Sequence, residues 1–242
     1  MRILTKIENY YKDNGILSTH FVCPYKKVCK GNNNKFYGPK STFISSGYEK
    51  GNLPKLLFLS LDPGKSEKDS VKRLPKSIRG IEEKRDISLL PKNRHWYKTH
   101  ELAFNILKRF NDDLTIDDVK HYFAHANTVK CSMNNPHRKQ AHKILFKNCR
   151  DYLISELEIL SPDIIVTQGN EAKLAIEKFI FKSKLRTNRY YQIVTINNKK
   201  VFWLHTFHPH NYGAFYKQYN KGKGWENYSK RIYDWYVNYI NA

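Results

Sequence analysis

Long apolar runs are absent from this sequence of 242 residues. No stretch approaches the roughly 18 consecutive apolar residues that a membrane-spanning helix needs, and no secretory signal opens the chain. The sequence therefore predicts a soluble, cytoplasmic protein with no membrane partner, in a compartment where disulfides are disfavoured.

Acidic residues are scarce as well. Asp and Glu total 22 against 43 Lys and Arg, which gives a formal net charge of +21. Such an excess attracts polyanions, and aromatic residues lie beside the basic ones, as in residues 94–98 (Arg-His-Trp-Tyr-Lys), where rings can stack on bases while cations meet phosphates. The composition favours nucleic acid as the partner, and a DNA partner would imply a location at the nucleoid, although a merely soluble, Lys-rich protein would share this composition.

Cysteine is limited to four residues in two pairs, Cys23 with Cys29 and Cys131 with Cys149. Five residues separate the first pair and seventeen the second, whereas structural zinc sites usually use gaps of about two to four residues. Four thiolates suit a metal cluster, and the wide gaps favour a [4Fe-4S] cluster over zinc. Four thiols without a metal remain the alternative.

The length suits one sizeable core, and we expect a single domain over residues 1–242 that acts as a monomer. Residues 20–52 are rich in Gly, Asn and Lys and carry the first cysteine pair, and residues 65–94 form a highly charged insertion. Both segments show little periodicity, so neither contributes an obvious part of the core.

Apolar runs and helical periodicity alternate along the rest of the chain. Strands are predicted at residues 56–59, 122–129, 164–167, 190–196 and 200–205, and helices at residues 1–13, 102–110, 138–160, 170–181 and 225–240. This alternation predicts an α/β fold, a three-layer α/β/α sandwich with a largely parallel central sheet of about four strands. Ligands of such sheets bind beyond the carboxyl ends of the strands, where this chain has Asp62, Asn127 and His208.

Taken in order, these motifs resemble the uracil-DNA glycosylase superfamily, and the cysteines resemble its iron-sulfur, family 4-like branch. In that branch a strand ends in a Gly-Glu-Ala-Pro-Gly turn with a Glu three residues later; here residues 60–64 read Ser-Leu-Asp-Pro-Gly, and Glu67 keeps the later acid. Residues 127–131 (Asn-Thr-Val-Lys-Cys) match an Asn-x-x-Lys-Cys block, and residues 206–209 (Thr-Phe-His-Pro) are similar to Thr-Tyr-His-Pro. Residues 162–169 resemble the third strand with its glycine turn, so the resemblance spans about residues 20–215.

The chain departs from the branch in two respects. Its cysteine gaps are wider, which implies a remodelled cluster loop. Asp62 stands where the branch has Ala and the uracil-specific enzymes outside it have Asp, so a catalytic acid is restored at a different point.

The resemblance implies roles that the chemistry of the side chains supports. Base cleavage builds positive charge on the sugar and negative charge on the base, so Asp62 would orient the attacking water and His208 would donate to a base oxygen. Asn127 has the donor and acceptor that reading a pyrimidine edge requires. The remaining predicted substrate contacts are Gly64, Glu67, a stacking ring from Trp96 or Tyr97, and Tyr212 as a wedge in the duplex; the predicted phosphate contacts are Lys130, Arg138 and Lys217.

The sequence thus predicts a DNA N-glycosylase that flips out and hydrolytically excises uracil or a related pyrimidine. Gly64 supplies no ring to exclude a substituent, so a glycosylase for bulky C5-modified cytosines in antiviral defence is one alternative. A non-catalytic iron-sulfur DNA-binding protein on the same fold is another, and a zinc-bearing RNA-binding module is a third.

Overall fold

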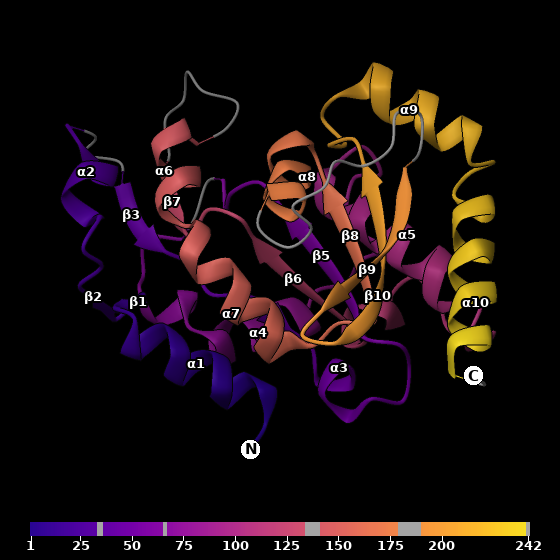
Figure 1. The fold of residues 1–242 in the computed structure, drawn as a ribbon, viewed down its shortest axis with the longest axis horizontal. Coiled ribbons are helices and arrows are strands. Elements are labelled where there is room, and N and C mark those ends of the chain that lie inside the picture. The colour runs from indigo at the N-terminus through magenta and orange to yellow at the C-terminus, as the bar shows by residue number, and fades with distance from the viewer. Residues whose placement is uncertain (33–35, 65–66, 134–140, 179–189, 241–242) are drawn as a thin grey trace.

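The computed structural model describes residues 1–32, 36–64, 67–133, 141–178 and 190–240. Within these residues, a six-stranded sheet forms the centre of the molecule (Figure 1). Its strands, in spatial order, are β4 (Phe43–Ile44), β6 (Phe123–Asn127), β5 (Leu56–Ser60), β8 (Ile164–Gln168), β10 (Lys199–Thr206) and β9 (Tyr191–Ile196). The four middle strands are parallel, and β4 and β9 pair antiparallel at the two edges. The predicted sheet of about four parallel strands is confirmed, with an antiparallel strand added on each side.

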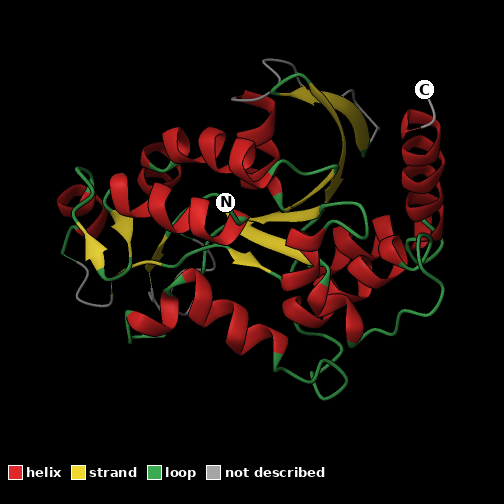
Figure 2. Ribbon diagram, turned by 90° about the horizontal axis from the view of Figure 1, so that it is seen from below, coloured by secondary structure: helices red, strands yellow, loops and turns green. Residues whose placement is uncertain are grey.

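Helices cover both faces of this sheet (Figure 2). Successive side chains of a strand point to opposite faces. Leu57 and Leu59 of β5 therefore pack with α1 (Ile3–Asp13), α7 (Arg150–Leu160) and α8 (Asn170–Ile176), while Leu56 and Phe58 pack with α4 (Pro75–Glu83), α5 (His95–Leu107) and α10 (Glu226–Ile240). All of β5 and β8 is buried, which explains why both strands are almost continuously apolar in sequence. The predicted three-layer α/β/α architecture is confirmed.

The helices are α1 (Ile3–Asp13), α2 (Lys26–Lys30), α3 (Ser46–Lys50), α4 (Pro75–Glu83), α5 (His95–Leu107), α6 (Lys143–Asn148), α7 (Arg150–Leu160), α8 (Asn170–Ile176), α9 (Tyr212–Lys221) and α10 (Glu226–Ile240). Short 3-10 turns occur at Val71–Arg73 and Asp118–His121. Two small antiparallel sheets pair β1 (Ile16–Leu17) with β2 (His20–Phe21) and β3 (Phe36–Pro39) with β7 (Cys131–Met133). None of the described helices is both long enough and apolar enough to span a membrane.

The prediction of one helix over residues 138–160 is wrong in its described part. Two helices, α6 and α7, meet at Cys149, whose sulfur accepts a hydrogen bond from the Lys130 amide at 3.4 Å. The two weakly periodic segments also contain regular elements, because β3 pairs with β7 and α4 begins at Pro75 and buries Ile78 against the sheet. Contacts with distant parts of the chain order these segments, and no local sequence pattern predicts those contacts.

Candidate active site

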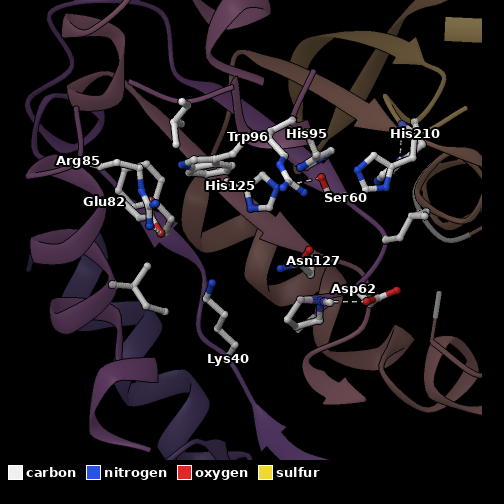
Figure 3. A pocket seen from close by; sticks show the side chains of 18 of the residues that line it. Lys40, Ser60, Asp62, Glu82, Arg85, His95, Trp96, His125, Asn127 and His210 are labelled. Atoms are coloured by element: carbon white, nitrogen blue, oxygen red, sulfur yellow. Dashed lines mark hydrogen bonds and ion pairs between the residues drawn. The ribbon is translucent and has the colours of Figure 1, made fainter. Parts of the chain in front are cut away.

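A cavity of about 660 Å³ lies at the carboxyl ends of the parallel strands (Figure 3). Strand register aligns the ends of β5 and β6 there, since Ser60 pairs with Asn127. The turn after β5 and the loop after β10 complete the wall, so residues from opposite ends of the sequence share one space. Among the residues predicted as functional, Asp62, Gly64, Trp96, Asn127 and His208 line this cavity.

Asp62 lies in the turn that follows β5, and backbone amides fix both of its carboxylate oxygens. The Gly64 amide donates to Oδ1 at 2.8 Å, and the Ala141 amide donates to Oδ2 at 2.9 Å. Gly64 has a φ of +60°, a left-handed conformation that favours glycine. Because each carboxylate oxygen has two lone pairs, the fixed group can still accept a hydrogen bond from a water molecule.

Asn127 ends β6 with its side chain 8% exposed, and its Oδ1 has no hydrogen-bond partner among the described residues. Its carbonyl oxygen accepts from Lys130 Nζ at 2.7 Å. Lys130 in turn is 2% exposed and forms an ion pair with the fully buried Glu156 of α7. A buried ion pair therefore supports Asn127 from behind and leaves its side-chain oxygen available to a ligand.

His208 is held as a neutral hydrogen-bond donor. Its ring stacks on His95 at a centroid distance of 4.8 Å and an interplanar angle of 9°. Burial, followed by the nearby His210, lowers the pKa of His208 to about 4, so the ring is uncharged at neutral pH. Because Nδ1 accepts the His210 amide at 3.2 Å, the single proton of the neutral ring lies on Nε2.

A hydrogen-bond chain continues across the floor of the cavity. The Ser60 hydroxyl contacts Gln168 Oε1 at 2.8 Å and His125 Nε2 at 2.9 Å, and His95 Nε2 contacts the same Gln168 oxygen at 3.2 Å. A hydroxyl has one proton, so when Ser60 donates to Gln168 it accepts from His125. Burial lowers the pKa of His95 to about 3 and that of His125 well below its usual value. The floor is therefore an array of neutral rings and amides.

Two residues fix the loop that carries His208. Gly169 has a φ of +98°, and a Cβ there would lie 3.1 Å from the Leu61 side chain and 3.3 Å from His208 Cβ. Gln218 of α9, which is 1% exposed, accepts from the Phe207 amide at 2.9 Å and donates to the His205 carbonyl at 2.7 Å. The absent side chain of Gly169 lets this loop approach β5, and Gln218 clamps its start.

Comparison with known protein families adds independent evidence. A family model described as the uracil DNA glycosylase superfamily matches residues 48–229. The chain belongs to this superfamily. The match covers the turn with Asp62, the end of β6 and the loop with His208, but it begins after Cys23 and Cys29, so it shows the superfamily and no branch within it. No curated protein gives a significant match to the chain.

Several predicted contacts of this glycosylase-superfamily chain lie elsewhere. Glu67 is exposed, its carboxylate accepts from the Lys68 and Asp69 amides, and it does not line the cavity. The prediction of Lys130 as a phosphate contact is wrong, because the side chain is buried and paired.

The other predicted contacts lie partly at the cavity and partly outside it. Tyr97 does not line the cavity, which leaves Trp96 as the ring of that pair that does. Tyr212 and Lys217 are exposed on α9, and Arg138 lies outside the described residues.

The sequence reasoning missed His95 and His125. His125 carried a usable signal, because alternation along β6 puts Phe123, His125 and Asn127 on one face of the strand. His95 carried none, since it is one of several aromatic and basic residues at the start of α5.

The cysteines gather at the end of the molecule formed by α2, α6 and β7 (Figure 1). Cys29, Cys131 and Cys149 share one apolar cluster, and Cys23 is half-buried. Burial raises the pKa of Cys149 to about 11 and that of Cys131 well above its usual value, and the neighbouring thiols raise both further. All four are free thiols.

Hydrogen-bond donors surround these sulfurs. Asn148 Nδ2 lies 3.4 Å from Cys29 Sγ, and the Tyr152 hydroxyl lies 3.4 Å from Cys23 Sγ. Such donors stabilise thiolates, and a bound cation would offset both the burial and the smaller mutual repulsion that raise the thiol pKa values, so the chemistry of these side chains fits metal ligands. Among the described residues, no group of three or more His, Cys, Asp or Glu is arranged to hold a metal ion.

Proposed function

We propose that this protein is a DNA glycosylase that flips a uracil or related pyrimidine out of DNA and hydrolyses its N-glycosidic bond. One observation carries the proposal: the Asp62 carboxylate and the neutral His208 ring, 146 positions apart in sequence, line the same cavity in a member of the uracil DNA glycosylase superfamily. We assign stabilisation of the positive charge that develops on the sugar to Asp62, and stabilisation of the negative charge that develops on the base to His208.

As the bond breaks, positive charge grows on the sugar and negative charge on the departing base. Asp62, held by two amides, stabilises the first and orients the attacking water. His208 donates through Nε2–H to the base oxygen as its charge develops. A neutral imidazole suits this role, because it needs no counter-ion in the ground state and its hydrogen bond strengthens as negative charge appears.

Base recognition falls to Asn127 and Trp96. Asn127 Oδ1 is buried and unpartnered among the described residues, and a hydrogen bond from the flipped base would relieve the cost of that burial. Trp96 lines the cavity next to His125, with its ring packed edge-on against that histidine at 5.0 Å. The family resemblance assigns the stacking role to this region of the chain.

Binding to DNA would rest on the net charge of +21 and on the exposed face of α9. Tyr212 is 51% exposed at the first turn of that helix, next to the loop with His208, and is our candidate for the wedge. Lys217, one turn further along, is our candidate for a phosphate contact.

We also propose that Cys23, Cys29, Cys131 and Cys149 hold a [4Fe-4S] cluster, with zinc as the alternative. Three of the four thiols share one apolar cluster and the fourth is half-buried, and thiolates are ligands of both iron-sulfur clusters and zinc. The cluster would be structural and would tie α2 to α6. Iron and zinc content of the purified protein, compared with that of a Cys131→Ser variant, tests the assignment, and metal-free protein would contradict it.

The decisive experiment measures base release from oligonucleotides carrying uracil, other deaminated bases or C5-modified cytosines, in single-stranded and duplex form. Wild-type protein should release a base from at least one of them, and Asp62→Asn should lower the rate by about 10²- to 10⁴-fold. Asp112→Asn, at an exposed site outside the cavity lining, is the matched control. A protein that binds every oligonucleotide and releases no base would be a non-catalytic DNA-binding protein.

A further inference from the structure

The cavity has a second part beyond the residues assigned to catalysis. Figure 3 shows Glu82 and Arg85 at the side opposite Asp62 and His210, with Trp96 and His125 between them. We call this part the polar arm and define it by Lys40, Ser41, Glu82, Arg85 and Arg94, all of which line the same cavity. Two segments build it: the residues between β3 and β4, and the end of α4 with the chain that leads to α5.

The volume of the cavity exceeds what an unsubstituted pyrimidine needs. At about 660 Å³ it lies well inside the range of roughly 300–1,000 Å³ typical of sites for drug-sized ligands, whereas uracil is a single ring with two oxygens. A base placed between Asp62, Asn127 and His208 would leave the polar arm unfilled. Something larger than uracil therefore matches the whole cavity.

Two residues that line the cavity on the side of the arm have unpartnered polar atoms. Ser41 is 4% exposed, and its hydroxyl has no hydrogen-bond partner among the described residues; the same holds for Trp96 Nε1. A buried polar group without a partner costs about 1–3 kcal/mol, so natural proteins keep few of them. A ligand group with oxygen atoms would satisfy both.

The charged groups of the arm further limit the kind of ligand that fits it. Lys40 points its amino group into the cavity (Figure 3), and burial lowers its pKa, an effect that nearby Glu82 opposes. Arg85 and Glu82 pair at 2.9 Å, so the arm offers cationic donors and one carboxylate acceptor side by side. Hydroxyl groups both accept and donate, so they can use the cationic donors and the Glu82 carboxylate together, whereas a carboxylate can only accept and leaves Glu82 without a ligand donor.

We infer that the polar arm binds a hydroxyl-bearing substituent on the pyrimidine ring, which makes a hydroxylated or sugar-bearing modified base the preferred substrate. This inference rests on the proposed glycosylase function and specifies its substrate class. Asn127 would bind the base edge, and Lys40 and Ser41 would bind the hydroxyl groups of the substituent.

The test compares kcat/KM for oligonucleotides carrying uracil, 5-hydroxymethylcytosine, its glucosylated form and 5-carboxylcytosine. Wild-type protein should prefer a hydroxyl-bearing base. Lys40→Met and Ser41→Ala should each lower the ratio of kcat/KM for that base to kcat/KM for uracil by about tenfold, the effect of one lost hydrogen bond in a buried site. Lys92→Met, an exposed change outside the cavity, should leave both values unchanged. Melting temperatures of all variants check that they fold.

The outcomes separate this inference from the proposed function. Release of uracil with all hydroxyl-bearing bases inert, or an equal loss on every substrate in Lys40→Met and Ser41→Ala, would overturn the inference and leave the glycosylase standing. Preference for 5-carboxylcytosine would also overturn it. Absence of base release from every oligonucleotide would overturn the proposed function itself. A second measurement detects binding in the arm without catalysis. Free 5-hydroxymethyl-2′-deoxycytidine should raise the melting temperature of the wild-type protein more than 2′-deoxycytidine does, and this difference should disappear in Lys40→Met.

Discussion

The two parts of the cavity are built on opposite principles. Around Asp62 and His208, the side chains are neutral rings, amides and one carboxylate, and most of their hydrogen bonds are already committed within the protein. The polar arm has charged groups, an unpartnered hydroxyl and an ion pair that solvent reaches. Groups fixed in advance suit a reaction in which charge develops, and unpartnered groups suit the recognition of a ligand. The difference separates the residues that should set the rate on every base from those that should choose among bases.

Breaking the buried Lys130–Glu156 ion pair behind Asn127 should have the largest effect. Lys130→Met leaves the Glu156 carboxylate buried without its partner, which we expect to cost about 3–5 kcal/mol of unfolding free energy in urea denaturation. Arg85→Met, which breaks the solvent-reached pair of the arm, should cost at most about 1 kcal/mol. Adding Glu156→Leu to Lys130→Met should recover only part of the loss, because Glu156 also accepts hydrogen bonds from the buried Tyr11 and Thr42 hydroxyls. Equal costs for the two single variants would remove the contrast between the two parts.

Removing the neutral donor should come next. His208→Phe should lower the rate of excision by about 10²- to 10³-fold on every substrate, because it keeps a ring but removes a donor placed where negative charge develops. Single-turnover rates measure this, with the exposed His20→Phe as control. A loss confined to one base would instead make His208 a specificity residue like those of the arm.

A smaller effect is expected from adding a side chain at Gly169, where the loop with His208 comes close to the end of β5. Gly169→Ala combines a left-handed φ with close contacts to Leu61 and His208, so it should destabilise the fold by about 1–3 kcal/mol and slow excision. Gly80→Ala is the matched control, because it lies inside α4 with open space around its Cβ and should stabilise by about 0.4–1 kcal/mol. Thermal melts of both variants would show the opposite signs.

The smallest effect over a single pH unit is a dependence of stability on pH. The pKa values of His95 and His208 lie at about 3 and about 4, below the ordinary value of about 6.5, so the unfolded chain binds more protons between these limits. Stability should be full above pH 6.5 and fall as pH drops towards 4, by about 1.4 kcal/mol per pH unit for each such histidine. His95→Phe keeps the stacked ring and should reduce the slope by one proton. An unchanged slope would mean that His95 does not stay neutral.

The sequence could predict the catalytic part of the cavity because parallel strands end at one edge of a sheet. Asp62, Asn127 and His208 each follow a recognisable strand, so the topology alone brings them together. Lys130 shows the limit of this reasoning. In a chain with 43 Lys and Arg, nothing local distinguishes a buried lysine, and its partner Glu156 lies on a helix 26 positions away.

The polar arm could not be predicted for a related reason. Lys40 and Ser41 come from a segment without periodicity, and they follow β3, which is placed by its pairing with β7, more than ninety positions later in the chain. Glu82 and Arg85 come from the charged insertion. In that insertion, the buried side chain of Ile78 packs α4 against the sheet. Pairings between distant, weakly patterned segments leave no signature in either segment alone.

The hydrogen bond from the Ala141 amide to Asp62 has a practical consequence for engineering this scaffold. Ala141 also packs with the buried cysteines, so the entrance to α6 is anchored on one side by thiols and on the other by the carboxylate. Shortening or rephasing α6 would relocate Asp62 even though no cavity residue had been touched. Fusion points and tags belong on α10, whose packing lies on the far side of the sheet from this linkage.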